Sequence, residues 1–189
     1  MFISNKSYDS VLFVHIPKTA GQSILSELDK KDLNSWNRVI HQNHDPFFVL
    51  QKNNEVNSRI FTFAVVRNPF RRTFSYYKHF NKVNNLSCTF SDFLSFIKKD
   101  EHYHKTPMIL YTQSFFCLDS NGDISLNKIY KHENLFELEQ DLNISLPHLN
   151  KGDYSEEEYF ESYSEKNKSF VRDYYSSDFY NFNYCSDFI

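Results

Sequence analysis

Short apolar runs alternate along this chain with longer stretches in which apolar residues recur every three or four positions. Val11–Val14 and the almost continuous run Ile60–Val66 predict two buried strands. Trp36–Ile40 and Ile124–Tyr130 predict two shorter strands. A near-continuous apolar run is typical of a strand that is covered on both faces, as in a parallel sheet.

The segments between these runs have the spacing of amphipathic helices. We expect a first helix over Ser23–Lys30, with Ser23 as its N-cap. Strands that alternate with helices predict an α/β fold, a parallel β-sheet flanked by helices, with right-handed crossovers. Further helices are expected over Pro46–Asn53, Pro69–His79, Phe90–Lys99 (capped near Ser91) and Leu135–Leu142, and in parts of the tail from Tyr154.

Composition narrows the class of protein. The length of 189 residues fits a single domain over residues 1–189 with one core. The chain has 20 Phe and 13 Tyr but only 3 Gly, which predicts a core built from aromatic side chains. The net charge of -3 does not suggest a nucleic-acid partner, so any basic site has to be local.

Cysteines and terminal segments indicate a compartment. Cys88, Cys117 and Cys185 are widely spaced and odd in number, which makes a zinc site or a disulfide framework improbable. Residues 1–10 contain no apolar signal segment, and no apolar run approaches the length of a membrane span. We therefore expect a cytoplasmic protein without a transmembrane segment.

The stretch HIPKTAGQS, residues 15–23, follows the first predicted strand and opens the first predicted helix. Such a junction forms an anion site, because free backbone N–H groups and the helix dipole point at the ligand. Lys18 adds a full charge, Thr19 and Ser23 add hydroxyl donors, and Gly21 permits close backbone approach. The lysine precedes the glycine, unlike in the nucleoside triphosphate loop G-x-x-x-x-G-K-[ST]. The alternative is an ordinary turn with an exposed lysine.

A second junction, VVRNPFRRTFSYY at residues 65–77, repeats this arrangement. Arg67 stands at the strand end, where ligands collect in open α/β sheets. Ser75 lies on a different face of the following helix from the residues that face the core, with Arg71 one turn before it and Arg72 three residues before it. Arginine pairs bidentately with phosphate oxygens. The alternative is a solvated basic helix start. Two anion sites at two strand ends predict a ligand with two separated anionic groups. The core-facing positions are Phe70, Phe74 and Tyr77.

Together the two motifs resemble those of sulfotransferases that use PAPS (3'-phosphoadenosine 5'-phosphosulfate). The resemblance is closest to the carbohydrate sulfotransferase branch, which includes heparan sulfate 2-O-sulfotransferase and small bacterial relatives. It implies a P-loop-like nucleotide-binding sulfotransferase fold. The family pattern R-[ND]-P-x-x-R-x-x-S-x-Y is matched by Arg67, Asn68, Pro69, Arg72, Ser75 and Tyr77. TQSFF (112–116), KHENL (131–135), LPHLNKG (146–152) and the closing YYSSDFYNFNY are similar to later family blocks.

The resemblance also implies which residues bind the donor. The first motif holds the 5'-phosphosulfate, and Arg67, Ser75 and the pair Lys151-Gly152 hold the 3'-phosphate. The family loop usually has a threonine where this chain has Gln22, which removes a hydroxyl but leaves an amide that can donate. The residues implied in the first motif are Pro17, Lys18, Thr19, Ala20, Gly21, Gln22 and Ser23.

The reaction implied is the transfer of a sulfuryl group from PAPS to an acceptor hydroxyl, with Lys18 stabilising the leaving oxygen and no metal needed. A general base, usually a histidine, takes the acceptor's proton. Relatives carry this base between the two motifs, where the chain has His41 and His44. The resemblance favours His44, whose spacing from the Arg67 motif is the closest to that in relatives. We expect His15 to orient other groups.

Other functions stay open at this point. Gln22 leaves room for a PAPS- or PAP-binding protein of the same fold that is catalytically weak or inactive. A nucleotide-dependent kinase would need a Mg²⁺ ligand and the other loop pattern, and neither is evident. The acceptor is a saccharide or another hydroxyl compound, and the sequence does not indicate the oligomeric state. The acidic run 156–158 is expected to be a solvated helix face.

Overall fold

A computed structural model describes residues 8–29, 38–40, 44–54, 56–100, 111–147 and 154–188, with the backbone alone at 38–40, 54, 99 and 100. The chain forms two compact units. One consists of residues 1–67 and 113–149 and is called the sheet unit here. The other consists of residues 68–112 and 150–189 and is called the helical unit.

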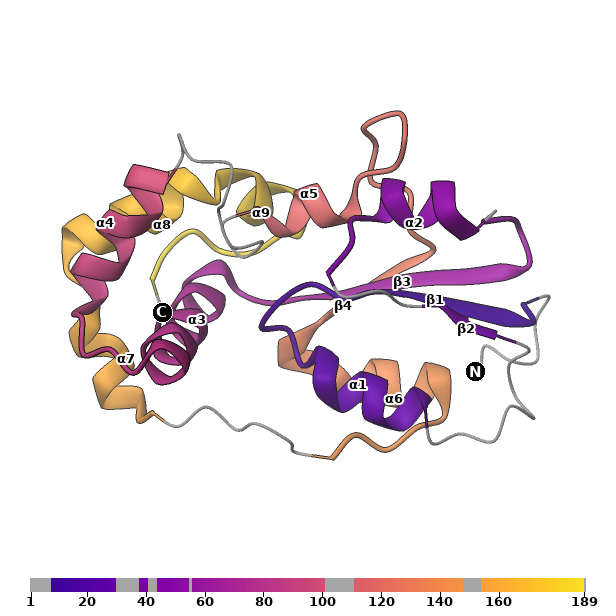
Figure 1. Cartoon of the computed structure of the whole chain (residues 1–189), viewed down its shortest axis with the longest axis horizontal. Helices are drawn as coiled ribbons and strands as arrows, with labels where there is room; N and C mark the ends of the chain where they lie inside the picture. Colours follow the sequence, from indigo (N-terminus) through magenta and orange to yellow (C-terminus); the bar gives the residue numbers. More distant parts are fainter. Residues whose placement is uncertain are drawn as a thin grey trace. The chain divides into compact units, whose positions relative to one another are not determined.

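The sheet unit is built on a parallel sheet whose described strands have the order β2-β1-β3-β4 (Figure 1). β1 and β3 pair from Ser10 opposite Ile60 to Val14 opposite Ala64. The two strands that precede the candidate motifs are therefore parallel neighbours, and the predicted α/β class is confirmed. The strands are β1 (Ser10–Val14), β2 (Arg38–Ile40), β3 (Ile60–Val66) and β4 (Lys128–Lys131).

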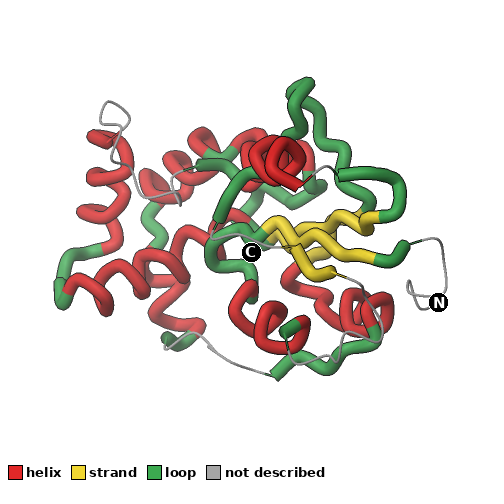
Figure 2. The backbone as a smooth tube through the Cα atoms, turned by 45° about the vertical axis from the view of Figure 1, so that its right-hand side comes forward, coloured by secondary structure: helices red, strands yellow, loops and turns green. Residues whose placement is uncertain are grey.

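Helices cover both faces of this sheet. α1 (Gly21–Leu28) and α6 (Leu135–Leu142) lie on one face, and α2 (Phe47–Asn54) and α5 (Gln113–Cys117) lie on the other (Figures 1 and 2). All seven residues of β3 are buried, as expected for a central strand between two helical layers. The core under α1 and α6 contains Phe13, Ile24, Phe63, Leu138 and further apolar side chains.

A side-chain lock fixes β3 against the segment that leads into β4. The backbone N–H and the hydroxyl of Thr62 both donate to Asn127 Oδ1, at 2.8 and 2.9 Å. The backbone N–H of Asn127 donates in return to Thr62 Oγ1 at 3.0 Å. This lock lies away from the strand ends that carry the motifs, because β3 begins at Ile60 and the second motif follows Val66.

The helical unit has an aromatic core, as the composition predicts. Phe70 and Phe74, in the helix that begins at Pro69, are almost completely buried, and Tyr163 donates its hydroxyl proton to the carbonyl of Phe70 at 2.7 Å. The ring of Tyr163 also packs against Phe90, with centroids 4.7 Å apart. The helices are α3 (Pro69–Asn84), α4 (Phe90–Asp100), α7 (Glu156–Ser162), α8 (Glu165–Tyr174) and α9 (Ser176–Asn181).

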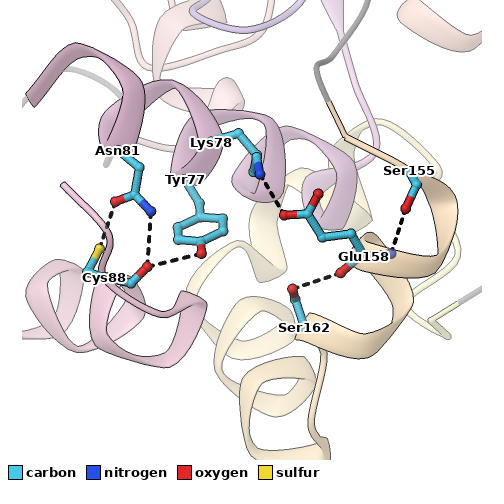
Figure 3. Close-up of polar contacts among 7 residues, drawn as sticks. All are labelled: Tyr77, Lys78, Asn81, Cys88, Ser155, Glu158 and Ser162. Atoms are coloured by element: carbon cyan, nitrogen blue, oxygen red, sulfur yellow. Dashed lines mark hydrogen bonds and ion pairs between the residues drawn. The ribbon is translucent and has the colours of Figure 1, made fainter. Parts of the chain in front are cut away.

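Polar contacts tie α3 to its neighbours within this unit (Figure 3). Tyr77 and Asn81 both donate to the backbone carbonyl of Cys88, each at 3.0 Å, just before α4 begins. The ammonium of Lys78 forms an ion pair with the carboxylate of Glu158 in α7, at 2.6 Å. Glu156 pairs bidentately with Arg71. The acidic run is therefore partly exposed, as predicted, and two of its members also hold α7 against α3.

Several expected element boundaries are wrong. α1 begins at Gly21, and its N-cap is Ala20 in the left-handed conformation, not Ser23. α4 begins at Phe90, as expected, and the residue that exchanges hydrogen bonds with Asp92 at its start is Thr89, two positions before Ser91. α3 runs five residues beyond its predicted end, and β4 starts at Lys128. Within the part of the chain described, no helix is long and apolar enough to cross a membrane.

Candidate functional site

The turn between β1 and α1 has an unusual backbone. Lys18 (φ 70°) and Ala20 (φ 69°) both adopt the left-handed conformation although neither is glycine. Between them, the buried Thr19 donates its hydroxyl proton to the carbonyl oxygen of Ile16 at 2.9 Å. Because the hydroxyl proton is used in this hydrogen bond, which closes the turn, the donor that Thr19 could offer an anion is its backbone N–H. Turns that contain left-handed residues point successive N–H groups at one spot.

The glycine of this turn has a neighbour that accounts for it. A Cβ added to Gly21 would lie 1.9 Å from Nε2 of His15, a distance that real Cβ atoms do not reach. The His15 ring is held in place by burial and by stacking on Phe13, with centroids 5.6 Å apart. Close approach does require the glycine, as the sequence suggests, but the approaching group is the His15 imidazole.

His44 lies beside His15 and is bound to it. Nδ1 of His44 is 2.8 Å from the backbone carbonyl oxygen of His15, and the two rings have centroids 4.2 Å apart. A carbonyl oxygen can only accept, so Nδ1 must donate, and the neutral His44 ring carries its lone pair on Nε2. His44 is therefore held in the tautomer that can accept a proton at Nε2. The other candidate, His41, is outside the described residues.

Arg67 directly follows β3 and reaches the first motif. Its Nη1 donates to the backbone carbonyl of Lys18 at 3.4 Å. Burial, followed by the positive charge of Arg67, lowers the pKa of the Lys18 ammonium below its ordinary value. Two cations held this close favour an anion, because a negative ligand would relieve their repulsion. The structure thus brings together the two charged residues that the sequence singled out at separate strand ends.

The backbone of Arg67 is held by a residue to which the sequence assigned no role. The N–H of Arg67 donates to Gln113 Oε1, and Gln113 Nε2 donates to the Arg67 carbonyl, both at 2.8 Å. Gln113 is the first residue of α5 and is completely buried. Gln113 lies in the family-like block TQSFF, but only the fold shows that its side-chain amide bonds to the backbone of Arg67.

His132 is a second such residue. β3 and β4 pair up to Val66 opposite Lys131, so Arg67 and His132 follow neighbouring strands at the same edge of the sheet. Burial, with a smaller contribution from the charge of Arg67, lowers the pKa of His132 from 6.5 to about 4. His132 is therefore a neutral imidazole near pH 7.

The remainder of the second motif belongs to the helical unit. Asn68 is the N-cap of α3 and accepts from the N–H groups of Phe70 and Arg71, with Pro69 in the first turn. Arg72 is 2% exposed and donates twice to the carbonyl of Tyr111, at 3.3 Å each. These contacts explain much of the motif by helix geometry.

The arginines expected near Ser75 have partners inside the helical unit. Besides its ion pair with Glu156, Arg71 stacks on Tyr159 with its guanidinium carbon 3.8 Å from the ring centroid. Ser75 is half-buried on α3, and Lys151 and Gly152 are outside the described residues. In the first motif, Pro17 and Ser23 are buried and Gln22 is exposed in the first turn of α1.

The comparison with protein families decides the class of protein. A model described as the sulfotransferase family matches residues 1–185, nearly the whole chain. The chain belongs to the sulfotransferase family. Searches of the curated proteins and of the solved structures gave no match. The sulfotransferase family predicted from the two motifs is thus confirmed, and the carbohydrate branch stays a prediction.

For a sulfotransferase, this edge of the sheet offers a defined set of groups. Lys18 and Arg67 supply positive charge, the left-handed turn supplies backbone N–H groups, and His44 supplies a proton acceptor. Anion binding and proton removal are the two tasks that transfer of a sulfuryl group to a hydroxyl requires. Among the described residues, no three His, Cys, Asp or Glu side chains come together in a way that could hold a metal ion.

Proposed function

We propose that this sulfotransferase uses PAPS as its donor and transfers the sulfuryl group to a hydroxyl of an acceptor, which the resemblance indicates is a carbohydrate. The observation that supports this most is the contact between Arg67 and the carbonyl of Lys18. It joins the two motifs, and with them two cations, at one edge of the sheet. A nucleotide with a phosphosulfate and a separate phosphate has the charges that such a pair favours.

The residues present fit this donor. The pKa of Lys18 is lowered first by burial and then by the charge of Arg67, and a bound polyanion would offset both effects. In the proposal, Lys18 and the turn bind the 5'-phosphosulfate, and Arg67 binds the 3'-phosphate. The parts of Ser75, Lys151, Gly152 and Ser23 in binding stay predictions from the resemblance.

His44 and Lys18 then each have a task in the transfer. PAPS supplies the sulfuryl group, and the protein positions the reactants and neutralises charge. Nε2 of His44 takes the proton of the acceptor hydroxyl, because its Nδ1 is engaged with the His15 carbonyl. The Lys18 ammonium stabilises negative charge on the oxygen that leaves with the phosphate.

The test compares His44→Ala with wild type and with His79→Ala, in which an exposed histidine of α3 is removed. Turnover is measured with labelled PAPS and a panel of saccharides and simple alcohols. A positioned general base contributes about 10²- to 10⁴-fold in rate, so we expect His44→Ala to lose that factor and His79→Ala to lose little. Affinity for PAP, measured by calorimetry, should stay near the wild-type value in both variants. If His44→Ala keeps its activity, the base is not His44, and His41→Ala becomes the next variant.

Gln22 supports one alternative, a PAP-binding protein with little or no activity. It is exposed in the first turn of α1, where the family usually has a threonine. Tight PAP binding without turnover on any acceptor would favour this alternative. A higher rate in Gln22→Thr would show that the loop chemistry limits the enzyme. Binding of ATP in preference to PAP would point to a kinase instead and would contradict the proposed donor.

A further inference from the structure

Two crossings between the units lie at described residues, and they are tied to each other. The chain leaves the sheet unit after Arg67 and re-enters it at Gln113. The side-chain amide of Gln113 satisfies both the N–H and the C=O of Arg67, each at 2.8 Å. A neighbouring strand would normally pair such groups, but the pairing of β3 with β4 ends at Val66. Gln113 thus extends the fixed backbone of β3 by one residue.

The arrangement is buried and hydrogen-bonded on both sides of the amide. Gln113 has no exposed surface, and a buried amide is tolerated only when its donor and acceptor are satisfied. By contrast, the contact of the Arg67 guanidinium with the Lys18 carbonyl is long, at 3.4 Å. The backbone of Arg67, from which its side chain extends, is therefore fixed by two short, buried hydrogen bonds.

We propose that Gln113 is a positioning residue that sets the affinity of the site for a nucleotide with a 3'-phosphate by fixing the backbone of Arg67. This inference rests on the proposed function, in which Arg67 binds that phosphate. In this inference Gln113 acts through Arg67 and not by contact with the nucleotide. It determines the point from which the guanidinium extends, and a small displacement there moves the charge away from the phosphate.

The first variant is Gln113→Met, which keeps the length of the side chain and removes both hydrogen bonds. The probes are PAP and 5'-AMP, which lacks the 3'-phosphate, titrated into the full chain by calorimetry. A lost hydrogen bond costs about two- to twelve-fold in an equilibrium constant, so we expect PAP to bind roughly three- to ten-fold more weakly and AMP to change less. The matched control is Asn127→Ala, which removes the two hydrogen bonds that Thr62 of β3 donates to the Asn127 side chain and should lower Tm without changing the ratio of PAP to AMP affinity.

A second pair of variants separates positioning from a general loss of stability. In an Arg67→Ala background, Gln113→Met should no longer weaken PAP, because the residue through which it acts is absent. Gln113→Glu keeps an acceptor for the Arg67 N–H but turns a second acceptor toward the Arg67 carbonyl. It should therefore weaken PAP at least as much as Gln113→Met does, and it decides the matter if the latter does not fold.

Two results would overturn the inference. One is a wild-type ratio of PAP to AMP affinity in both Gln113 variants. The other is an undiminished effect of Gln113→Met in the Arg67→Ala background. A wild-type protein without any preference for PAP over AMP would instead refute the proposed donor, and this inference with it.

Discussion

Gly21, the smallest residue of the first motif, makes room for the histidine that contacts the candidate base. Gly21 leaves the space that the His15 ring occupies, and His15 in turn contacts the His44 ring and accepts a hydrogen bond from it. A motif that looks like a loop for phosphate therefore also organises a histidine 23 positions farther along the chain. The link is local packing, and it can be tested without any ligand.

We expect Gly21→Ala to lower the free energy of unfolding by about 1–3 kcal/mol, as overpacking of a filled site does, because the new Cβ would displace His15. Combining it with His15→Ala should recover part of that loss, since the Cβ then has room. Gly122→Ala is the control: its Cβ would meet nothing within 4 Å, and only the positive φ of 86° opposes it. Urea unfolding is measured for wild type, Gly21→Ala, His15→Ala, the double variant and Gly122→Ala. Equal costs of Gly21→Ala with and without His15 would refute the explanation.

His132 predicts a dependence of stability on pH. Its pKa of about 4 in the folded protein lies below the ordinary 6.5, so the unfolded chain binds a proton more readily. The stability that the neutral ring allows is present above pH 6.5 and is lost as the pH falls toward 4. We expect the free energy of unfolding of His132→Gln to fall less steeply over this range than that of wild type. Parallel curves in urea unfolding would contradict the prediction.

At the scale of elements, the sequence predicts those whose signal is long and periodic. β1, β3 and α6 lie where expected because their apolar residues face a core. The sequence does not predict α5, since five residues carry no helical period. The start of α1 was misplaced because Ala20, a residue that disfavours the left-handed conformation, adopts it as the cap. Tertiary contacts of the turn override local preference there.

The N-terminus of α3 gives a prediction at this scale. Asn68 caps two N–H groups, so Asn68→Ala should cost about 0.5–2 kcal/mol in the free energy of unfolding, whereas Asn68→Asp keeps the acceptor and should cost little. Chemical denaturation of the three proteins makes the comparison. If the alanine and aspartate variants are equally destabilised, the role of Asn68 in the motif is not that of a cap.

At the scale of the molecule, a single domain was expected and two compact units are found. No linker marks their boundary, because it falls between Arg67 and Asn68, inside one motif. The sequence did indicate the charged residues and His44. It contained Gln113 and His132 in two family-like blocks but could not indicate what they do, because that depends on the backbone and the charge that lie next to them in the fold. An unfolding experiment can decide whether the two units unfold together as one domain or separately.

Phe188 offers a test of that cooperativity. Its ring packs on Phe70, Tyr159 and Tyr163 within the helical unit, with centroids 4.5–5.2 Å apart. We expect Phe188→Ala to cost about 1–3 kcal/mol and, by hydrogen exchange, to reduce protection in the helical unit more than in β1 and β3. Tyr180→Ala, at a side chain 84% exposed, is the control. An equal loss of protection in β1 and β3 would show that the chain unfolds as one cooperative domain.

The contact between the two histidine rings has a spectroscopic consequence. The His44 ring lies 4.2 Å from that of His15 and is tilted by 48°, so its carbon-bound protons experience the ring current of an aromatic neighbour. In NMR spectra their resonances should be displaced from those of the other histidines, and His15→Ala should abolish the displacement. The candidate base thus has a signature of its own, which can be followed through titration with acid or nucleotide before any acceptor has been identified.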